Sequence, residues 1–403
     1  MHRASRRLAS LGLAVALVGA AACSGDDGDN ASDAPDTTEA VAAEFELDPA
    51  AADAAVATYA ELVHTSYTDL VTSATAMQTA IDAFLAAPSD ATLQAAKQSW
   101  LDARVLYGPT EVFRFYDGPI DDADDGPEGQ INAWPLDEAY IDYVEGNLDA
   151  GIVNDVAGVP DITTEVLVAA NEEAGETNIS TGWHAIEFLL WGQDLSVDGP
   201  GARPVTDYTT APNADRRGTY LKLLAQLLID DLTSVRDQWA PGAEYRVEFE
   251  RDGEQSIKNI FRGMGALAQG ELAGERIAVA YDNQDQEDEH SCFSDNTTAD
   301  IAGNARGVRM AYLADHPGID TPSLSDAVAA AAPELDAALR ASLDDAVAQA
   351  EALQAPFDQL FLGADDAPGR VQLDELIDDL TDLGDLIADT AAKVGHPVSI
   401  ELG

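Results

Sequence analysis

The most constraining feature of the sequence is an apolar stretch that is interrupted by one imidazole and one carboxylate. It covers residues 182–194 and reads GWHAIEFLLWGQD. Its two functional groups, His184 and Glu187, are three residues apart, so an α-helix would place both on one face. Burying a carboxylate in such a run is costly unless something compensates its charge. The stretch therefore predicts a buried helix that carries a paired histidine and glutamate.

Two interpretations of His184 and Glu187 stay open. The pair can bind one metal ion, as Glu-x-x-His pairs do in helical bundles, or it can be a hydrogen-bonded polar pair without a ligand. The chain has six histidines and no His-Glu-x-x-His motif, so a metal site here would consist mainly of carboxylate oxygens. Oxygen ligands with one imidazole suit iron or manganese and also accept zinc or copper.

A second polar stripe is predicted on a helix that covers residues 91 to about 115. Trp100, Arg104, Tyr107 and Glu111 follow one another at intervals of 4, 3 and 4 residues, which places them on one helical face. One interpretation is an internal ion pair of Arg104 with Glu111 or a neighbour. The other is that Glu111 supplies a further metal oxygen, while Arg104 and Tyr107 orient the ligands.

A third stretch, residues 285–297, reads DQEDEHSCFSDNT. One interpretation is that its polar residues Asp288, Ser291 and Asp295 complete a ligand site in space, with His290 as a possible ligand. The alternative is an acidic turn that caps the following helix. Cys292, in the same stretch, is expected to be a buried small residue, because the chain has two cysteines and no disulfide framework.

Residues 182–194 and 285–297 together resemble the two signatures of the imelysin-like proteins. This family includes iron-regulated surface proteins and was first classed as metallopeptidases. The resemblance extends over residues 50–397. It implies two helical bundles packed side by side, with the motif regions at a shared cleft. It also implies a metal ion, with iron as the expected element, bound by His184 and Glu187.

Two functions are consistent with that resemblance. The first is a metal-binding protein of iron uptake or sensing, with Glu111 as the third ligand and an iron-transport protein as a partner. The second is a metallopeptidase in which the metal activates water. No known protease motif is present and no residue is assigned as the catalytic base. We therefore favour a binding protein over an enzyme.

The N-terminus is typical of an export signal. Three arginines precede an apolar segment at residues 8–18, which is too short for an ordinary membrane span. We predict a signal peptide over 1–22 and lipidation of Cys23, followed by an acidic tether over 23–46. An ordinary signal-peptidase site is the alternative. Either way the protein is exported, and the lipid would anchor it to the membrane at the cell surface or in the periplasm.

The charge and the helical patterns bound the remaining possibilities. The chain of 403 residues has 74 acidic and 21 basic side chains, giving a net charge of −53, which argues against nucleic-acid partners. No segment is typical of a strand, so we predict an all-α fold. Two helical bundles are expected at 47–200 and 215–403, joined by a Gly- and Pro-containing linker at 201–214. Each of the following ranges is expected to form one long helix: 48–84, 91–115, 216–239, 254–281, 297–313, 333–353 and 371–394.

Overall fold

The computed structural model describes residues 43–354 and 356–402. The predicted signal peptide, the lipidation site Cys23 and most of the tether lie outside these residues. Every regular element in the described ranges is a helix, and the one β-bridge there joins Val144 and Asn147. The all-α prediction is confirmed. No described helix combines the length and the low charge that a membrane span requires.

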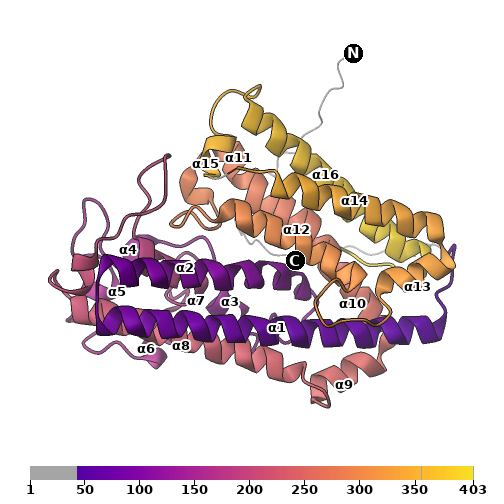
Figure 1. Ribbon diagram of the computed structural model, residues 1–403, viewed down its shortest axis with the longest axis horizontal. Coiled ribbons are helices and arrows are strands. Elements are labelled where there is room, and N and C mark those ends of the chain that lie inside the picture. The colour runs from indigo at the N-terminus through magenta and orange to yellow at the C-terminus, as the bar shows by residue number, and fades with distance from the viewer. Residues whose placement is uncertain (1–42, 355, 403) are drawn as a thin grey trace, which may run out of the picture. The chain divides into compact units, whose positions relative to one another are not determined.

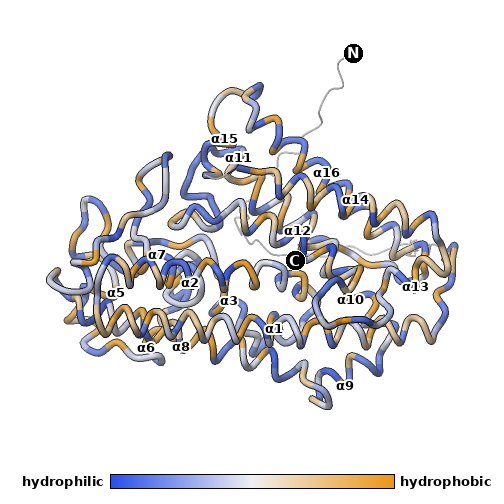
Figure 2. The backbone as a smooth tube through the Cα atoms, in the orientation of Figure 1, coloured by the Kyte–Doolittle hydropathy of each residue, from blue (hydrophilic) through white to orange (hydrophobic). Residues whose placement is uncertain are grey.

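The first group of helices surrounds the predicted signature helix. It consists of α1 (Pro49–Ala86), α2 (Asp90–Tyr107), α7 (Gly182–Trp191) and α8 (Ala214–Gln238). Helix α1 packs against α2 and α8, and α7 packs against the same two helices (Figure 1). Hydrophobic and hydrophilic residues alternate along α1 (Figure 2), as expected of a helix with one buried face.

Short elements fill the chain between these helices. They are η1 (Gly108–Phe113), α3 (Glu128–Ile131), α4 (Glu138–Ile141), α5 (Gly151–Asn154), α6 (Thr164–Ala170) and η2 (Val205–Tyr208).

The second group contains α10 (Gly253–Gly265), η3 (Ala266–Ala278), α12 (Thr297–Leu313), α14 (Pro333–Glu351) and α16 (Pro368–Lys393). Helix α12 packs against α14, α14 against α16, and α16 against α10 and η3. The smaller elements of this part are α9 (Glu244–Arg251), α11 (Val279–Asn283), η4 (Gln286–Asp288), α13 (Leu324–Ala331) and α15 (Asp358–Phe361).

The two groups are in direct contact. Element η1 packs against α12, and α1 packs against α9, α10 and α13. Gly108 in η1 allows the first contact, since a Cβ atom there would lie 3.3 Å from the Cα atom of Gly303 in α12. The boundaries predicted at 47–200, 201–214 and 215–403 remain predictions, although α8, which follows 201–214, packs with α1 and α7.

Two predicted helices differ from the structure. The helix expected over 91–115 ends as an α-helix at Tyr107 and continues as the 3₁₀ element η1. Pro109 explains this, because proline lacks the backbone N–H that would continue the α-helical hydrogen bonds. Glu111 therefore lies on η1, off the α-helical stripe that carries Arg104 and Tyr107.

The helix expected over 254–281 is also interrupted. It consists of α10, the π-helical element η3 and the short α11. A π-helix bonds residues i and i+5, and such segments are frequent at functional sites. In η3 this spacing aligns Glu271 with Arg276, whose Nη2 atom lies 2.9 Å from the Glu271 carboxylate.

A buried ion cluster fixes the segment that precedes α8. Asp142 is fully buried and accepts hydrogen bonds from Nη1 of Arg203 at 2.8 Å and from Nε of Arg217 at 2.6 Å. Arg203 also pairs with Asp207 at 3.1 Å. Arg203 lies near the start of residues 201–214, and Arg217 lies three residues past their end. Both are therefore bonded to Asp142, the residue that follows α4.

We expect Asp142→Ala to lower the free energy of unfolding by about 3–5 kcal/mol, because it leaves two buried guanidinium groups without their main partner. The matched control is Asp82→Ala, which removes an exposed partner of Lys222 and should cost about 0–1 kcal/mol. Urea unfolding measures both. Equal losses in the two variants would show that the Asp142 cluster does not hold this segment.

Candidate functional site

Helix α7 lies entirely inside the protein. All ten of its residues are buried, and glycines with positive φ stand at both ends: Gly182 at 84° and Gly192 at 75°. A Cβ atom at Gly182 would lie 2.5 Å from the carbonyl oxygen of Ile131, so a side chain is excluded there. These glycines allow the chain to enter and leave a tightly packed helix, which confirms the buried helix predicted from the sequence.

His184 and Glu187 are bonded to each other. The Nδ1 atom of His184 lies 3.0 Å from Oε2 of Glu187. The other carboxyl oxygen, Oε1, accepts hydrogen bonds from the backbone N–H of Ser294 at 2.9 Å and from its hydroxyl at 2.7 Å. Both oxygens of Glu187 are therefore engaged by the protein. The Nε2 atom of His184 is buried and has no hydrogen-bond partner.

A second imidazole lies beside the first. The ring centroids of His184 and His290 are 4.7 Å apart, and Nδ1 of His290 lies 2.8 Å from Oδ2 of Asp300. Both histidines thus have a carboxyl group at Nδ1. A carboxyl group at Nδ1 fixes the orientation of an imidazole ring, and in metal sites Nε2 of such a ring is the atom that binds the metal.

Asp300, on α12, is the most heavily bonded carboxylate of the site. It accepts hydrogen bonds from Nε and Nη2 of Arg104 at 3.1 and 3.2 Å, from the Ser291 hydroxyl at 2.6 Å and from the Asn296 amide at 3.0 Å. Arg104 also donates to Oδ1 of Asn132 at 2.6 Å. Arg104 therefore forms an internal ion pair, as one of the two interpretations predicted. Its partner is Asp300 and not Glu111.

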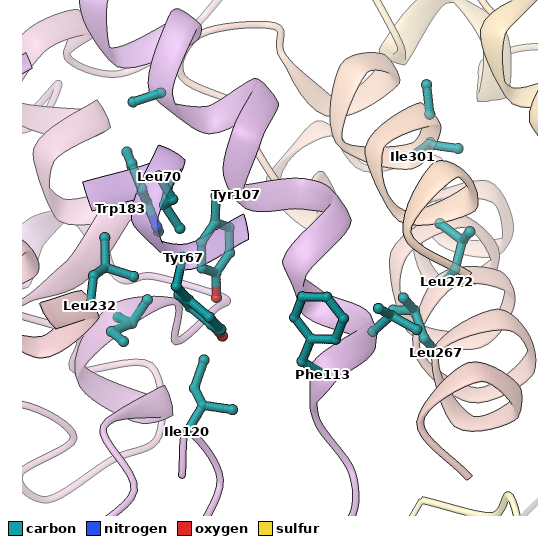
Figure 3. Close-up of a cluster of buried hydrophobic side chains, with 14 of the residues drawn as sticks. Tyr67, Leu70, Tyr107, Phe113, Ile120, Trp183, Leu232, Leu267, Leu272 and Ile301 are labelled. Carbon is teal, nitrogen blue, oxygen red and sulfur yellow. The ribbon is translucent and has the colours of Figure 1, made fainter. Parts of the chain in front are cut away.

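Glu111 lies among arginines. Nη2 of Arg276 pairs with its carboxylate, and Nη1 of Arg114 lies 3.7 Å from it. Tyr107, by contrast, has a buried hydroxyl without a hydrogen-bond partner. Figure 3 shows Tyr107 in one cluster with Tyr67 and Trp183, and the rings of Tyr107 and Trp183 are 5.5 Å apart.

The three candidate ligand residues from 285–297 have different surroundings in the structure. Ser291 lies within the site through its bond to Asp300. Asp288 accepts a hydrogen bond from the amide of Asn283 at 2.7 Å and is partly exposed. Asp295 is partly buried in the turn before α12, and burial raises its pKa to about 7.

Burial dominates the electrostatics of the histidine pair. It lowers the pKa of His184 well below the ordinary value, and the Arg104 cation adds to this effect. Burial raises the pKa of Glu187 to about 8. Burial, with the Arg276 cation, lowers the pKa of His290 to about 4. Both imidazoles are therefore uncharged at neutral pH, the form that binds metals.

The fit to a metal ion is partial. Within residues 43–354 and 356–402, no three His, Cys, Asp or Glu side chains are arranged to hold one. The free Nε2 atom of His184 fits a metal as a single nitrogen ligand. The oxygens of Glu187 are occupied by Ser294 and His184, and Glu111 is paired with Arg276.

Three residues that shape this site do not stand out in the sequence. Ser294 lies in the second signature, and its role required knowing that this turn reaches Glu187. Asp300 and Arg276 lie on helices that the periodicity marked only as packing elements. A charged residue on the apolar face of a predicted helix was the available signal for both.

We expect the two buried imidazoles to weaken the protein in mild acid. In the unfolded chain a histidine takes up its proton near pH 6.5, whereas folded His290 does so near pH 4. Between these values His290 binds its proton more readily in the unfolded state, so its own contribution to the free energy of unfolding falls as the pH drops from 6.5 to 4. Each imidazole contributes up to about 1.4 kcal/mol per pH unit.

His290→Gln should reduce that slope, because one titrating imidazole is removed. Urea unfolding at several pH values between 7 and 4.5 gives the slope directly. His316→Gln is the control, since this side chain is 14% exposed near the surface. A His290→Gln slope equal to that of the unmodified protein would contradict the assignment, whatever the variant's absolute stability.

Comparisons with known proteins agree with the two signatures. The family model described as imelysin, Peptidase_M75, matches residues 63–387. A protein named iron-regulated protein A from Synechococcus elongatus is 25% identical over 263 residues, which cover 62% of this chain and 61% of that protein.

A solved structure shares the fold. It is described as an iron-regulated protein A precursor from Parabacteroides distasonis, with a TM-score of 0.67 and 20% identity over 86% of this chain and 96% of that one. This likeness concerns the fold alone. On the family match, which covers most of its length, the chain belongs to the imelysin family.

Proposed function

We propose that this protein is an exported imelysin-family lipoprotein that binds a metal ion, iron, at His184 and acts in iron uptake or sensing. The observation that carries the proposal is the Nε2 atom of His184, which is buried without a partner while Glu187 holds Nδ1 at 3.0 Å. A carboxylate on one ring nitrogen and a metal on the other is a recurrent arrangement in metalloproteins.

In this proposal Glu187 orients His184 and is not itself a ligand. Both of its oxygens are already engaged, since Oε1 accepts from Ser294 and Oε2 is hydrogen-bonded to Nδ1 of His184, so direct coordination would break one of these contacts. Glu111 would join the site as a third group through Oε1, which is buried without a hydrogen-bond partner, while Oε2 keeps its ion pair with Arg276. A bound iron ion would supply a Lewis-acidic positive centre among these groups.

The choice of iron comes from the relatives. The Synechococcus protein is named iron-regulated protein A, and its match covers 61% of its own length, so its role enters here only as a proposal. Zinc, manganese and copper also suit a site with one imidazole and oxygen ligands. A lipid at Cys23 would anchor the protein to the membrane, where it would meet an iron-transport partner.

Element analysis of tag-free protein tests the proposal. The dialysed protein is reloaded with competing iron, zinc, manganese and copper, and its metal content is measured by mass spectrometry. We expect near-stoichiometric iron, its loss in His184→Ala, and an affinity about 10- to 100-fold weaker in Glu187→Gln. His316→Ala is the control and should retain the metal.

Two results would overturn the proposal. Metal content that is unchanged in His184→Ala would place any bound ion elsewhere. Metal-dependent cleavage of a peptide library, lost in His184→Ala, would instead favour the metallopeptidase function. We expect no cleavage, because no residue near Nε2 of His184 is assigned as a general base.

A further inference from the structure

Two exposed leucines line one groove at the end of helix α7. Leu148 and Leu195 are 74% and 64% exposed, the highest values among the large hydrophobic side chains that the structure describes. The groove that they line has a volume of about 400 Å³, and Tyr143 and Trp191 also line it. We call it the leucine groove. A single exposed leucine is ordinary, but apolar side chains that gather around a hollow mark an interaction site.

The first leucine follows a closed turn. Val144 and Asn147 form two backbone hydrogen bonds with each other, both of 3.1 Å, and Leu148 is the next residue. The backbone N–H of Glu145 donates to Oε1 of Gln193 at 2.6 Å. This bond joins the turn to the segment that carries the second leucine, so the two walls of the groove support each other.

The segment with the second leucine is bonded to distant parts of the chain. The side-chain amide of Gln359 donates to the carbonyl of Val197 at 2.7 Å. The backbone N–H of Gly201 donates to the carbonyl of Phe293 at 2.9 Å. These bonds hold the backbone on the C-terminal side of Leu195, and a surface that is ordered before binding loses less conformational entropy when a partner covers it.

Acidic side chains flank the leucine groove. Glu145 lines it, Asp149 follows Leu148, and Asp198 follows Val197, and all three acids are exposed. Carboxylates beside an apolar surface favour a partner whose own apolar side chains are next to lysine or arginine. They disfavour a second copy of this chain, which would bring the same acids, and they disfavour an anionic membrane surface.

The basic groups near the groove are buried and do not offset these acids at the surface. Arg203 lines the groove, but its guanidinium is buried and paired with Asp142 at 2.8 Å and with Asp207 at 3.1 Å. Lys97 is also buried, and its Nζ atom lies 5.1 Å from the ring centre of Trp191. The groove therefore presents apolar surface and negative charge to a partner.

We propose that the leucine groove docks a partner protein through a segment that combines apolar side chains with lysine or arginine. An amphipathic helix is such a segment, since its apolar residues at i, i+3, i+4 and i+7 form one anchoring stripe. Trp191 is the last residue of α7 and Gly192 follows it in the groove wall. The docked partner is therefore in contact with the helix that carries His184, and the proposal does not depend on metal binding there.

Peptide binding to the full metal-free protein tests the docking surface. The probe is a labelled helical peptide of leucine and lysine, with its leucines at i, i+3, i+4 and i+7. One matched peptide has serine in place of leucine, and another has glutamate in place of lysine. Fluorescence anisotropy is measured at about 0.15 M salt, where charges more than about 8 Å apart are screened. We expect the leucine–lysine peptide to bind at least about tenfold more tightly than either matched peptide.

Leu148→Ser combined with Leu195→Ser is the decisive variant. Both side chains are exposed, so the change leaves the core intact. We expect the affinity for the leucine–lysine peptide to fall by about tenfold or more for each leucine, because covering a leucine side chain contributes at least that much. Val156→Ser combined with Val247→Ser is the matched control. These valines are 52% and 49% exposed and do not line the groove, so this variant should bind as the unmodified protein does.

Hydrogen–deuterium exchange gives the position of the bound peptide. We expect the leucine–lysine peptide to slow exchange in residues 143–149 and 191–204 and to leave α14 unchanged. Glu145→Gln combined with Asp198→Asn should slow association and weaken its salt dependence, because the steering charges are removed.

Four outcomes would contradict the docking surface. One is no binding of the leucine–lysine peptide, and another is equal affinity in the unmodified protein and in the folded leucine variant, with folding checked by circular dichroism. Sedimentation of the unmodified protein as a dimer, lost in the leucine variant, would assign the groove to a second copy. Binding to phosphatidylcholine vesicles, lost in the same variant, would assign it to a membrane.

Discussion

The carboxylate of Glu187 is the interaction on which the candidate site depends. It accepts from Ser294 on one oxygen and contacts His184 with the other, and so joins two signatures that are about a hundred residues apart in the chain. Because these bonds use both oxygens, Glu187 acts as a support for the imidazole. The neighbouring histidine repeats the pattern, with Asp300 at Nδ1 of His290.

Charge compensation explains why the site is rich in arginine within an acidic chain. The chain has a net charge of −53, and its buried carboxylates require specific partners. Asp300 has Arg104, and Glu111 has Arg276. The second of these pairs connects the first helix group to the π-helical element η3, which makes the polar interior part of the packing between the groups.

The fold class, the buried signature helix and its neighbours could be predicted from the sequence because apolar periodicity and glycine positions report local geometry. The end of the α-helix at Tyr107 could have been predicted as well, because Pro109 lacks the backbone N–H that an α-helix requires. The partners of Arg104 and Glu111 could not, because Asp300 and Arg276 come from helices more than a hundred residues away. The role of Glu187 could not be predicted either. Its spacing from His184 is the same whether the carboxylate binds a metal or supports the imidazole.

Anomalous diffraction at the iron edge from crystals of iron-loaded protein tests the central claim most directly. The account predicts a peak within about 2.2 Å of Nε2 of His184, near the usual metal–imidazole distance, with Glu187 still bonded to Nδ1 and to Ser294. A peak at the Glu187 oxygens, with its bond to His184 broken, would contradict the supporting role. The absence of any peak beside His184 would contradict metal binding at this site.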